Sequence, residues 1–405
     1  MAHAGPESDP APPDGARAAK PRTLLQVVPS LVTGGVERGT VDVAAAAARA
    51  GYRSIVASGG GPMVRELLRA GAEHIERPLQ SKNPLTLKRN AQWLAELVGR
   101  EGVDLVHARS RAPAWSAYWA AQRTQTPFVT TFHGTYSLNA PGKKSYNSVM
   151  TRGDRVIAIS SFIAEHIRTH YELDATRLRT IPRGIDAALY DPEAVSAERV
   201  IRLAERWRLP DGMPIVLLPG RLTRWKGQLL LIKALTAVEE GPVRCLLVGS
   251  SQGREAYRRE LEATARELGV ADMVHVIEDC DDMPAAYKLA DVVVSASTDP
   301  EAFGRVAVEG QAMGRPVIAP RHGGAVDQVR EGETGWLFKP SDPYDLALKI
   351  DLALKLSPEA RAAMHAAGVE NARTRFTKER MCADTLKVYD ELLGPMDGPA
   401  GESAT

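Results

Sequence analysis

A strand, a turn and the start of a helix follow one another in the stretch Val292-Val293-Val294-Ser295-Ala296-Ser297-Thr298-Asp299-Pro300-Glu301-Ala302-Phe303-Gly304-Arg305-Val306-Ala307-Val308-Glu309. Such a junction leaves backbone N–H groups unpaired at the positive end of a helix dipole, which suits a phosphate. Glu301 and Glu309 flank it, and carboxylates can accept hydrogen bonds from sugar hydroxyls. The stretch therefore predicts a pocket for a sugar joined to a phosphate.

Fixed positive charge lies about eighty residues upstream, in Gly220-Arg221-Leu222-Thr223-Arg224-Trp225-Lys226-Gly227. This segment follows an expected strand at 215–218. The planar fork of Arg221 can grip a phosphate bidentately, and Lys226 adds a mobile point charge. Together with the acidic window, which is the stretch from Glu301 to Glu309, these cations indicate a pocket for a sugar joined to a diphosphate.

Strands alternate with helical segments along the whole chain, which favours parallel sheets covered by helices. We therefore expect an α/β protein with two Rossmann-like, doubly wound domains, over residues 23–190 and 191–377, facing each other across a cleft. A polar segment near 184–195 is the expected linker. The expected strands are 23–28, 53–57, 103–107, 128–133 and 156–160 in the first domain, and 215–218, 244–248, 274–277, 292–295 and 316–319 in the second.

The two ends of the chain, residues 1–22 and 394–405, are expected to be disordered tails, and the first lacks the apolar segment of a signal peptide. An apolar face runs along an expected helix at 378–393, which must pack on something. The chain contains no apolar run of roughly 18–20 residues that could span a bilayer. We expect a cytoplasmic protein that could contact the cytoplasmic face of the inner membrane peripherally.

Charge and cysteine usage exclude several classes of protein. The formal net charge of +1 argues against a nucleic-acid partner, which usually requires a basic domain. Cys245, Cys280 and Cys382 fit neither a disulfide framework nor metal-ligand spacing. Position 36 is Val, so the first strand is not followed by the glycine fingerprint of a dinucleotide-binding dehydrogenase.

An ordered set of motifs over residues 22–393 resembles the retaining glycosyltransferases of family 4 (glycosyl transferases group 1), which have the GT-B fold. The resemblance implies that helix 378–393 returns to the first domain. The motifs are Gly34-Gly35, His133-Gly134, Gly220-Arg221 with Lys226-Gly227, the Glu-x7-Glu window at 301–309, Met313 to Ala319, and Gly323-Gly324.

The resemblance implies transfer of a hexose-type sugar from a nucleotide-diphosphate sugar to an acceptor hydroxyl, with retention, without a metal and without another cofactor. A UDP-sugar is preferred over a GDP-sugar. The implied catalytic residues are His133, Arg221, Lys226 and Glu301, and the implied donor-binding residues are Gly34, Gly35, Arg221, Lys226, Phe303, Gly304, Arg305 and Glu309. The Asp279-Cys280-Asp281-Asp282 segment matches a metal-binding Asp-x-Asp pattern only superficially, because the resemblance places it beside the nucleotide base.

The acceptor is indicated less directly. Residues 135–152 mix aromatic side chains with Lys143, Lys144 and Arg152. With Arg109, Arg111, Trp115 and Trp119, this segment would give the first domain a basic and partly aromatic face, suited to an anionic or lipid-linked glycan. A plain solvated face is the alternative. The segment is also similar to bacterial transferases that build envelope polysaccharide or lipopolysaccharide core.

Two residues depart from the pattern of the family. Arg183 stands where the family commonly has Asn, and Asp327 stands where Glu is usual.

Three other functions are alternatives to glycosyl transfer. The same fold would also serve a nucleotide-sugar epimerase or a phosphorylase, although a phosphorylase would need a longer chain. A non-catalytic sugar-nucleotide sensor would not require the whole set of charges. Release of a nucleoside diphosphate separates an enzyme from a sensor.

Overall fold

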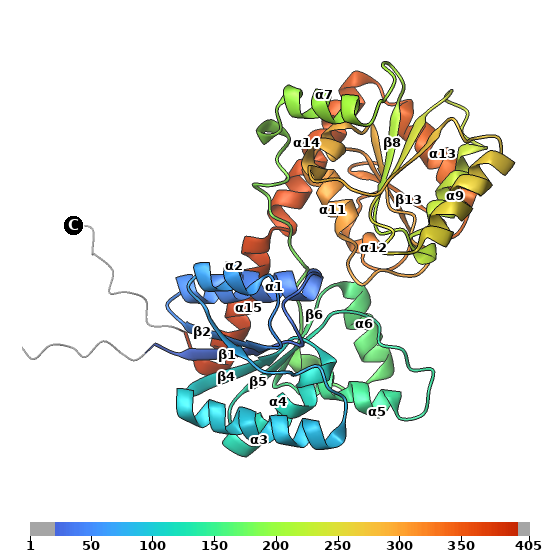
Figure 1. Cartoon of the computed structure of the whole chain (residues 1–405). Helices are drawn as coiled ribbons and strands as arrows, with labels where there is room; N and C mark the ends of the chain where they lie inside the picture. Colours follow the sequence, from blue (N-terminus) through green and yellow to red (C-terminus); the bar gives the residue numbers. More distant parts are fainter. Residues whose placement is uncertain (1–20, 396–405) are drawn as a thin grey trace, which may run out of the picture.

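The computed structural model describes residues 21–395. Apart from residues 21–22 and 394–395, the expected disordered tails lie outside the described residues. Within this range the chain forms two parallel sheets, each covered by helices (Figure 1). The expected α/β fold of two Rossmann-like domains is confirmed.

The first domain contains a seven-stranded sheet in the order β3-β2-β1-β4-β5-β6-β7. Its central strands β1 (TLLQV) and β5 (FVTTF) are short and buried along their whole length, their polar residues included, as expected for parallel strands covered on both faces. The strands are β1 Thr23–Val27, β2 Arg53–Ser58, β3 Glu73–Glu76, β4 Val103–Ala108, β5 Phe128–Phe132, β6 Arg155–Ala158 and β7 Leu178–Thr180. The helices are α1 Gly35–Arg49, α2 Val64–Arg69, α3 Pro84–Glu101, α4 Arg111–Thr124, α5 Lys143–Asn147 and α6 Ser161–His170.

The second domain contains a six-stranded sheet in the order β10-β9-β8-β11-β12-β13. Its strands are β8 Ile215–Pro219, β9 Arg244–Val248, β10 Val274–Ile277, β11 Val292–Val294, β12 Val317–Pro320 and β13 Gly335–Phe338. The remaining helices are α7 Ala197–Arg206, α8 Gln228–Leu235, α9 Glu255–Glu267, α10 Met283–Leu289, α11 Arg305–Ala312, α12 Ala325–Gln328, α13 Pro343–Leu354, α14 Pro358–Arg375 and α15 Lys378–Leu393.

Each of the ten expected strands is present, with ends that differ by no more than two residues. The sequence did not indicate β3, β7 or β13, and all three lie at sheet edges. An edge strand pairs on one side only, so it can be short and polar. The strands β3 (EHIE) and β7 (LRT) are both, and β13 (GWLF) begins with a glycine.

Two crossings connect the domains, and they run side by side. The Ile185 N–H donates to the Phe376 carbonyl at 2.8 Å, and the Lys378 N–H donates to the Ile185 carbonyl at 2.8 Å. The backbones approach so closely that a Cβ added at Gly184 would lie 2.2 Å from the Thr377 carbonyl oxygen. A glycine at position 184 is therefore a requirement of this crossing.

After the second crossing, α15 lies against the first domain beside α1 (Figure 1). Its buried face, which includes Met381, Val388 and Tyr389, packs in one cluster with Leu105 and Ile157 of the first sheet.

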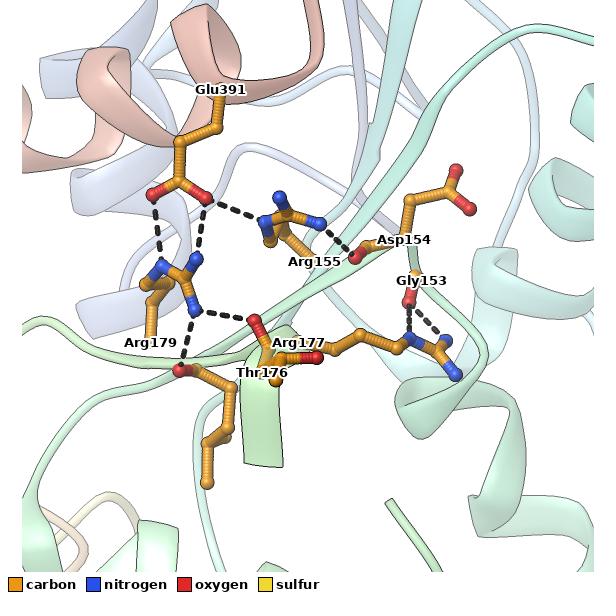
Figure 2. Close-up of polar contacts among 8 residues, drawn as sticks. Gly153, Asp154, Arg155, Thr176, Arg177, Arg179 and Glu391 are labelled. Carbon is orange, nitrogen blue, oxygen red and sulfur yellow. Dashed lines mark hydrogen bonds and ion pairs between the residues drawn. The ribbon is translucent and has the colours of Figure 1, made fainter. Parts of the chain in front are cut away.

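Ion pairs fix the last turn of α15 to the same sheet. The Glu391 carboxylate accepts from Arg155 of β6 and from both arms of Arg179 of β7, at 2.5–2.8 Å (Figure 2). The C-terminal helix is therefore an integral part of the first domain.

We expect Gly184→Ala to lower the free energy of unfolding by about 1–3 kcal/mol, because the methyl group must displace backbone at the crossing. The matched control is Gly99→Ala within α3, where a Cβ meets no atom within 4 Å. There the better helix propensity of alanine should raise stability by roughly 0.5–1 kcal/mol. Urea unfolding of both variants checks this. Equal midpoints would contradict the close crossing.

Candidate active site

The loops after β8 and β11 lie directly against each other. Gly227 adopts φ 73° at the start of α8, and a Cβ there would lie 1.9 Å from the Ala296 carbonyl oxygen. Because β8 and β11 are neighbours in the sheet, the cationic loop at 220–227 and the acidic window at 301–309 meet at one sheet edge.

Lys226 and Glu301 form an ion pair at this meeting point. The Lys226 Nζ atom lies 2.7 Å from Glu301 Oε1, and the two side chains are only 14% and 17% exposed. The Ser297 hydroxyl also donates to Oε1, at 2.5 Å. The Lys226 ammonium lies 4.5 Å from the centre of the Trp225 ring. Two residues that were assigned to one pocket from distant motifs are therefore in contact.

Gly304 adopts φ 80° and starts α11, so Phe303, Gly304 and Arg305 lie at the N-terminal end of that helix. The turn is held from behind by the loop after β12 and by α12. The Gly324 N–H donates to the Glu301 carbonyl at 2.8 Å, and Gln328 Nε2 donates to the Phe303 carbonyl at 2.6 Å.

His322 lines a small hollow with Glu301 and Gly304, and both of its ring nitrogens are buried without a hydrogen-bond partner in residues 21–395. This histidine was not among the predicted site residues, although its position directly before the Gly323-Gly324 motif was an available signal.

Glu309 lies on α11 and is 7% exposed. The Tyr287 hydroxyl of α10 donates to Oε2 at 2.7 Å, and burial with the nearby Glu309 charge raises the pKa of this tyrosine. The second carboxylate oxygen, Oε1, lies 3.8 Å from Arg305 Nε. Tyr287 therefore holds one carboxylate oxygen of Glu309, and the other oxygen can accept hydrogen bonds from a ligand.

The two arginines of the cationic loop have different surroundings. Arg224 pairs with Glu260 on α9 at 2.5 Å and lies over the Tyr257 ring. Arg221 is exposed, and its guanidinium has no hydrogen-bond or ion-pair partner within the described part of the chain. Of the two arginines, Arg221 is therefore the one that is free to take an external anion.

The first domain contributes Gly34, Gly35 and His133. Gly34 adopts φ 144° and precedes α1, and His133 follows β5. His133 lines a small cavity with Arg109 and Arg183. Burial, together with these two guanidinium groups, lowers the pKa of His133 well below its ordinary value of 6.5, so the ring is neutral near pH 7.

The domains touch each other at the acidic window itself. The hydroxyl of Ser160, the N-cap residue of α6, donates to the Ala302 carbonyl at 2.6 Å. The Ser161 N–H, at the start of α6, donates to Asp327 Oδ2 at 2.8 Å. Asp327, noted above as a departure from the family pattern, is thus a contact between the domains.

Other expected residues lie elsewhere. Asp281 and Asp282 pair with Arg206 and Arg199, respectively. The basic and aromatic segment at 135–152 helps to line an open hollow of about 780 Å³, where Lys144 and Arg152 lie near Tyr118. Arg109 does not belong to this face, contrary to our expectation. It is 3% exposed and lies beside His133, because it directly follows the buried strand β4.

Two family models cover most of the chain. Glycosyl transferases group 1 matches residues 201–371, and Glycosyltransferase Family 4 matches residues 33–189. The D-inositol 3-phosphate glycosyltransferase of Xylanimonas cellulosilytica is 33% identical over 301 residues, which are 71% of this chain and 71% of that protein. The chain belongs to glycosyltransferase family 4. The resemblance stated from its motifs is confirmed.

Solved structures agree with this assignment. A glycosyltransferase from Rickettsia africae ESF-5 gives a TM-score of 0.86 at 37% identity, covering 92% of this chain and 99% of that one. Anabaena HepE, solved in complex with UDP-glucose, gives a TM-score of 0.75 at 25% identity, covering 90% and 99%. The GT-B architecture and the transferase activity of the family 4 protein follow from these matches.

We expect the stability of this family 4 protein to fall as pH drops from 7.5 to 5.5. Burial lowers the pKa of both His107 and His133, so below about pH 6.5 the unfolded chain takes up protons that the folded chain does not. The loss should be on the order of 1 kcal/mol per histidine at pH 5.5. Urea unfolding across this range measures it, and His133→Gln should flatten the slope. A stability that stays constant or rises on acidification would contradict neutral buried rings.

Proposed function

We propose that this protein is a retaining hexosyltransferase that uses a UDP-sugar. The observation that carries the proposal is the Lys226–Glu301 ion pair beside the N-terminal end of α11, with Arg221 unpaired nearby. The ion pair places a cation that could bind a diphosphate directly beside a carboxylate that could bind sugar hydroxyls. The 25% identical HepE, solved with UDP-glucose, supports UDP as the nucleotide.

In this proposal the second domain stabilises the leaving group. Breaking the anomeric C–O bond moves negative charge onto the diphosphate, where Arg221, Lys226 and the N–H groups of Gly304 and Arg305 would receive it. Glu301 would accept hydrogen bonds from the sugar. Glu309, steadied by Tyr287, would accept them from the ribose.

In the proposed reaction the acceptor oxygen attacks the anomeric carbon from the side that the diphosphate leaves. A C–O bond to the acceptor forms, the C–O bond to phosphate breaks, and the hydroxyl proton passes to a departing phosphate oxygen. His133 supports this route, because a ring with a strongly lowered pKa is a weak base. Its role would be to orient the sugar or the acceptor by hydrogen bonding. No metal takes part in these steps.

The proposed acceptor is an envelope glycan or glycolipid, such as lipopolysaccharide core, reached at the cytoplasmic face of the membrane. The hollow lined by Lys144, Arg152 and Tyr118 supports contact with anionic material. Within residues 21–395, no helix combines the length and the apolar character needed to cross a bilayer. A second candidate acceptor is a cyclitol phosphate, favoured by the 33% identical relative named as a D-inositol 3-phosphate glycosyltransferase.

The stereochemical course can be tested without the natural acceptor, because water can replace it slowly. Incubation with UDP-glucose labelled with ¹³C should release UDP and, by NMR, the α-anomer of glucose first. EDTA should leave the rate unchanged. Release of the β-anomer first would contradict retention, and a product with altered sugar configuration would indicate an epimerase. No UDP release from any of a panel of UDP-, GDP-, ADP- and dTDP-sugars would favour a sensor.

We expect Lys226→Met and Arg221→Met to lower the rate of UDP release about 10²–10³-fold, since each removes a preorganised positive charge from the leaving group. Arg224→Met is the matched control, because this neighbouring cation already pairs with Glu260. Its rate should stay within about twofold of the wild type if exposed pairs contribute little. Equal losses in all three variants would contradict the assigned geometry.

A further inference from the structure

Two buried guanidinium groups in the first domain lack adequate partners. Arg109 is 3% exposed, and its side chain has no hydrogen bond or ion pair with residues 21–395, with Nε fully buried. Arg183 is 8% exposed, and its guanidinium contacts the Gly35 carbonyl as its single hydrogen-bond acceptor within the same range. Buried charges are normally paired, so this arrangement calls for an explanation.

The two arginines and His133 converge at one sheet edge. Arg109 follows β4, His133 follows β5 and Arg183 lies beyond β7, so all three leave the carboxyl ends of strands in one sheet. A Cβ added at Gly39 of α1 would lie 2.7 Å from Arg183 Nη1 and 3.0 Å from Arg109 Nη2. The two guanidinium groups therefore lie against the same point of α1, and they line one cavity with His133.

The charge at this cluster is not compensated by the protein. The nearest acidic influences, Glu37 and Asp42 of α1, form no ion pair within 4 Å with either arginine among the described residues. Burial and the Arg109 charge lower the pKa of Arg183 to about 9. Both ring nitrogens of His133 are buried and unpartnered in residues 21–395. The cluster offers several unused donors and no acceptor charge.

We propose that Arg109, Arg183 and His133 bind an oxyanion, a carboxylate or a phosphate, carried by the acceptor sugar. The inference rests on the proposed function, in which the second domain holds the donor and its diphosphate. Because the donor's charge is matched there by Arg221 and Lys226, the anion for this cluster comes from the other substrate. The cavity holds only about 10 Å³, so binding in this proposal requires Arg183 to leave the Gly35 carbonyl and open it.

Thermal unfolding without ligand separates a binding role from a structural role. Removing an unpaired buried charge should leave the melting temperature of Arg109→Met unchanged or higher. A structural arginine would lower it. Arg183→Asn provides a second variant with a smaller polar residue at the crossing. Lower melting temperatures in both variants would overturn the proposal.

Ligand binding is tested with three probes of similar hydroxyl pattern, namely glucose, glucuronate and glucose 6-phosphate, and with UDP as a donor-site probe. The wild type should be stabilised by at least one anionic probe and not by glucose. Arg109→Met and Arg183→Asn should each weaken the binding of that probe at least tenfold. Both variants should keep the rise in melting temperature that UDP causes. Arg123→Met, at an exposed position of α4 outside both hollows, is the control and should keep both shifts in melting temperature.

Each outcome has a distinct meaning. Preference for glucuronate or for glucose 6-phosphate identifies a carboxylate or a phosphate as the ligand group. Absence of any anion shift in the wild type overturns the cluster as a site, and loss of the UDP shift in both variants overturns its assignment to the acceptor. A shift with an anionic probe but none with UDP supports the cluster as a site and contradicts the proposed use of a UDP-sugar.

Discussion

The ion pair between Lys226 and Glu301 is the contact on which the site geometry depends. It joins the loops that follow two neighbouring strands, β8 and β11, and it requires their backbones to meet at Gly227 and Ala296. The first domain reaches the same window through the Ser160 hydroxyl. A displacement of either loop would therefore disturb the charge pair, the start of α11 and the contact between the domains together.

The two domains differ in how their charges are balanced. In the second domain Lys226 is paired, Glu309 is held by Tyr287, and the exposed Arg221 faces solvent. In the first domain, buried Arg109 and Arg183 lie together without carboxylate partners in the described chain. A protein maintains such uncompensated charge at a cost in stability, which is characteristic of binding sites. The second of the two side-by-side crossings leads into α15, which packs on this domain.

Strand ends and glycine turns could be predicted from the sequence because they depend on local pattern. The junction at 301–309 and the cationic loop were located in this way, and the sheet order brings them together. Side-chain surroundings could not be predicted, because they depend on tertiary packing. Arg109 was expected on an exposed face and is buried, and His322 gave no periodic signal. The Tyr287 partner of Glu309 comes from another helix, and edge strands such as β3 lack an apolar run.

A crystal structure of the protein with bound UDP would test the central claim most directly. We expect the diphosphate at the N-terminal end of α11, within hydrogen-bond distance of Lys226 and Arg221, and the ribose hydroxyls on Glu309. We also expect Glu301 to stay at the site of the missing sugar, next to Ser297. A nucleotide bound away from α11, or one whose phosphates contact neither cation, would contradict the account.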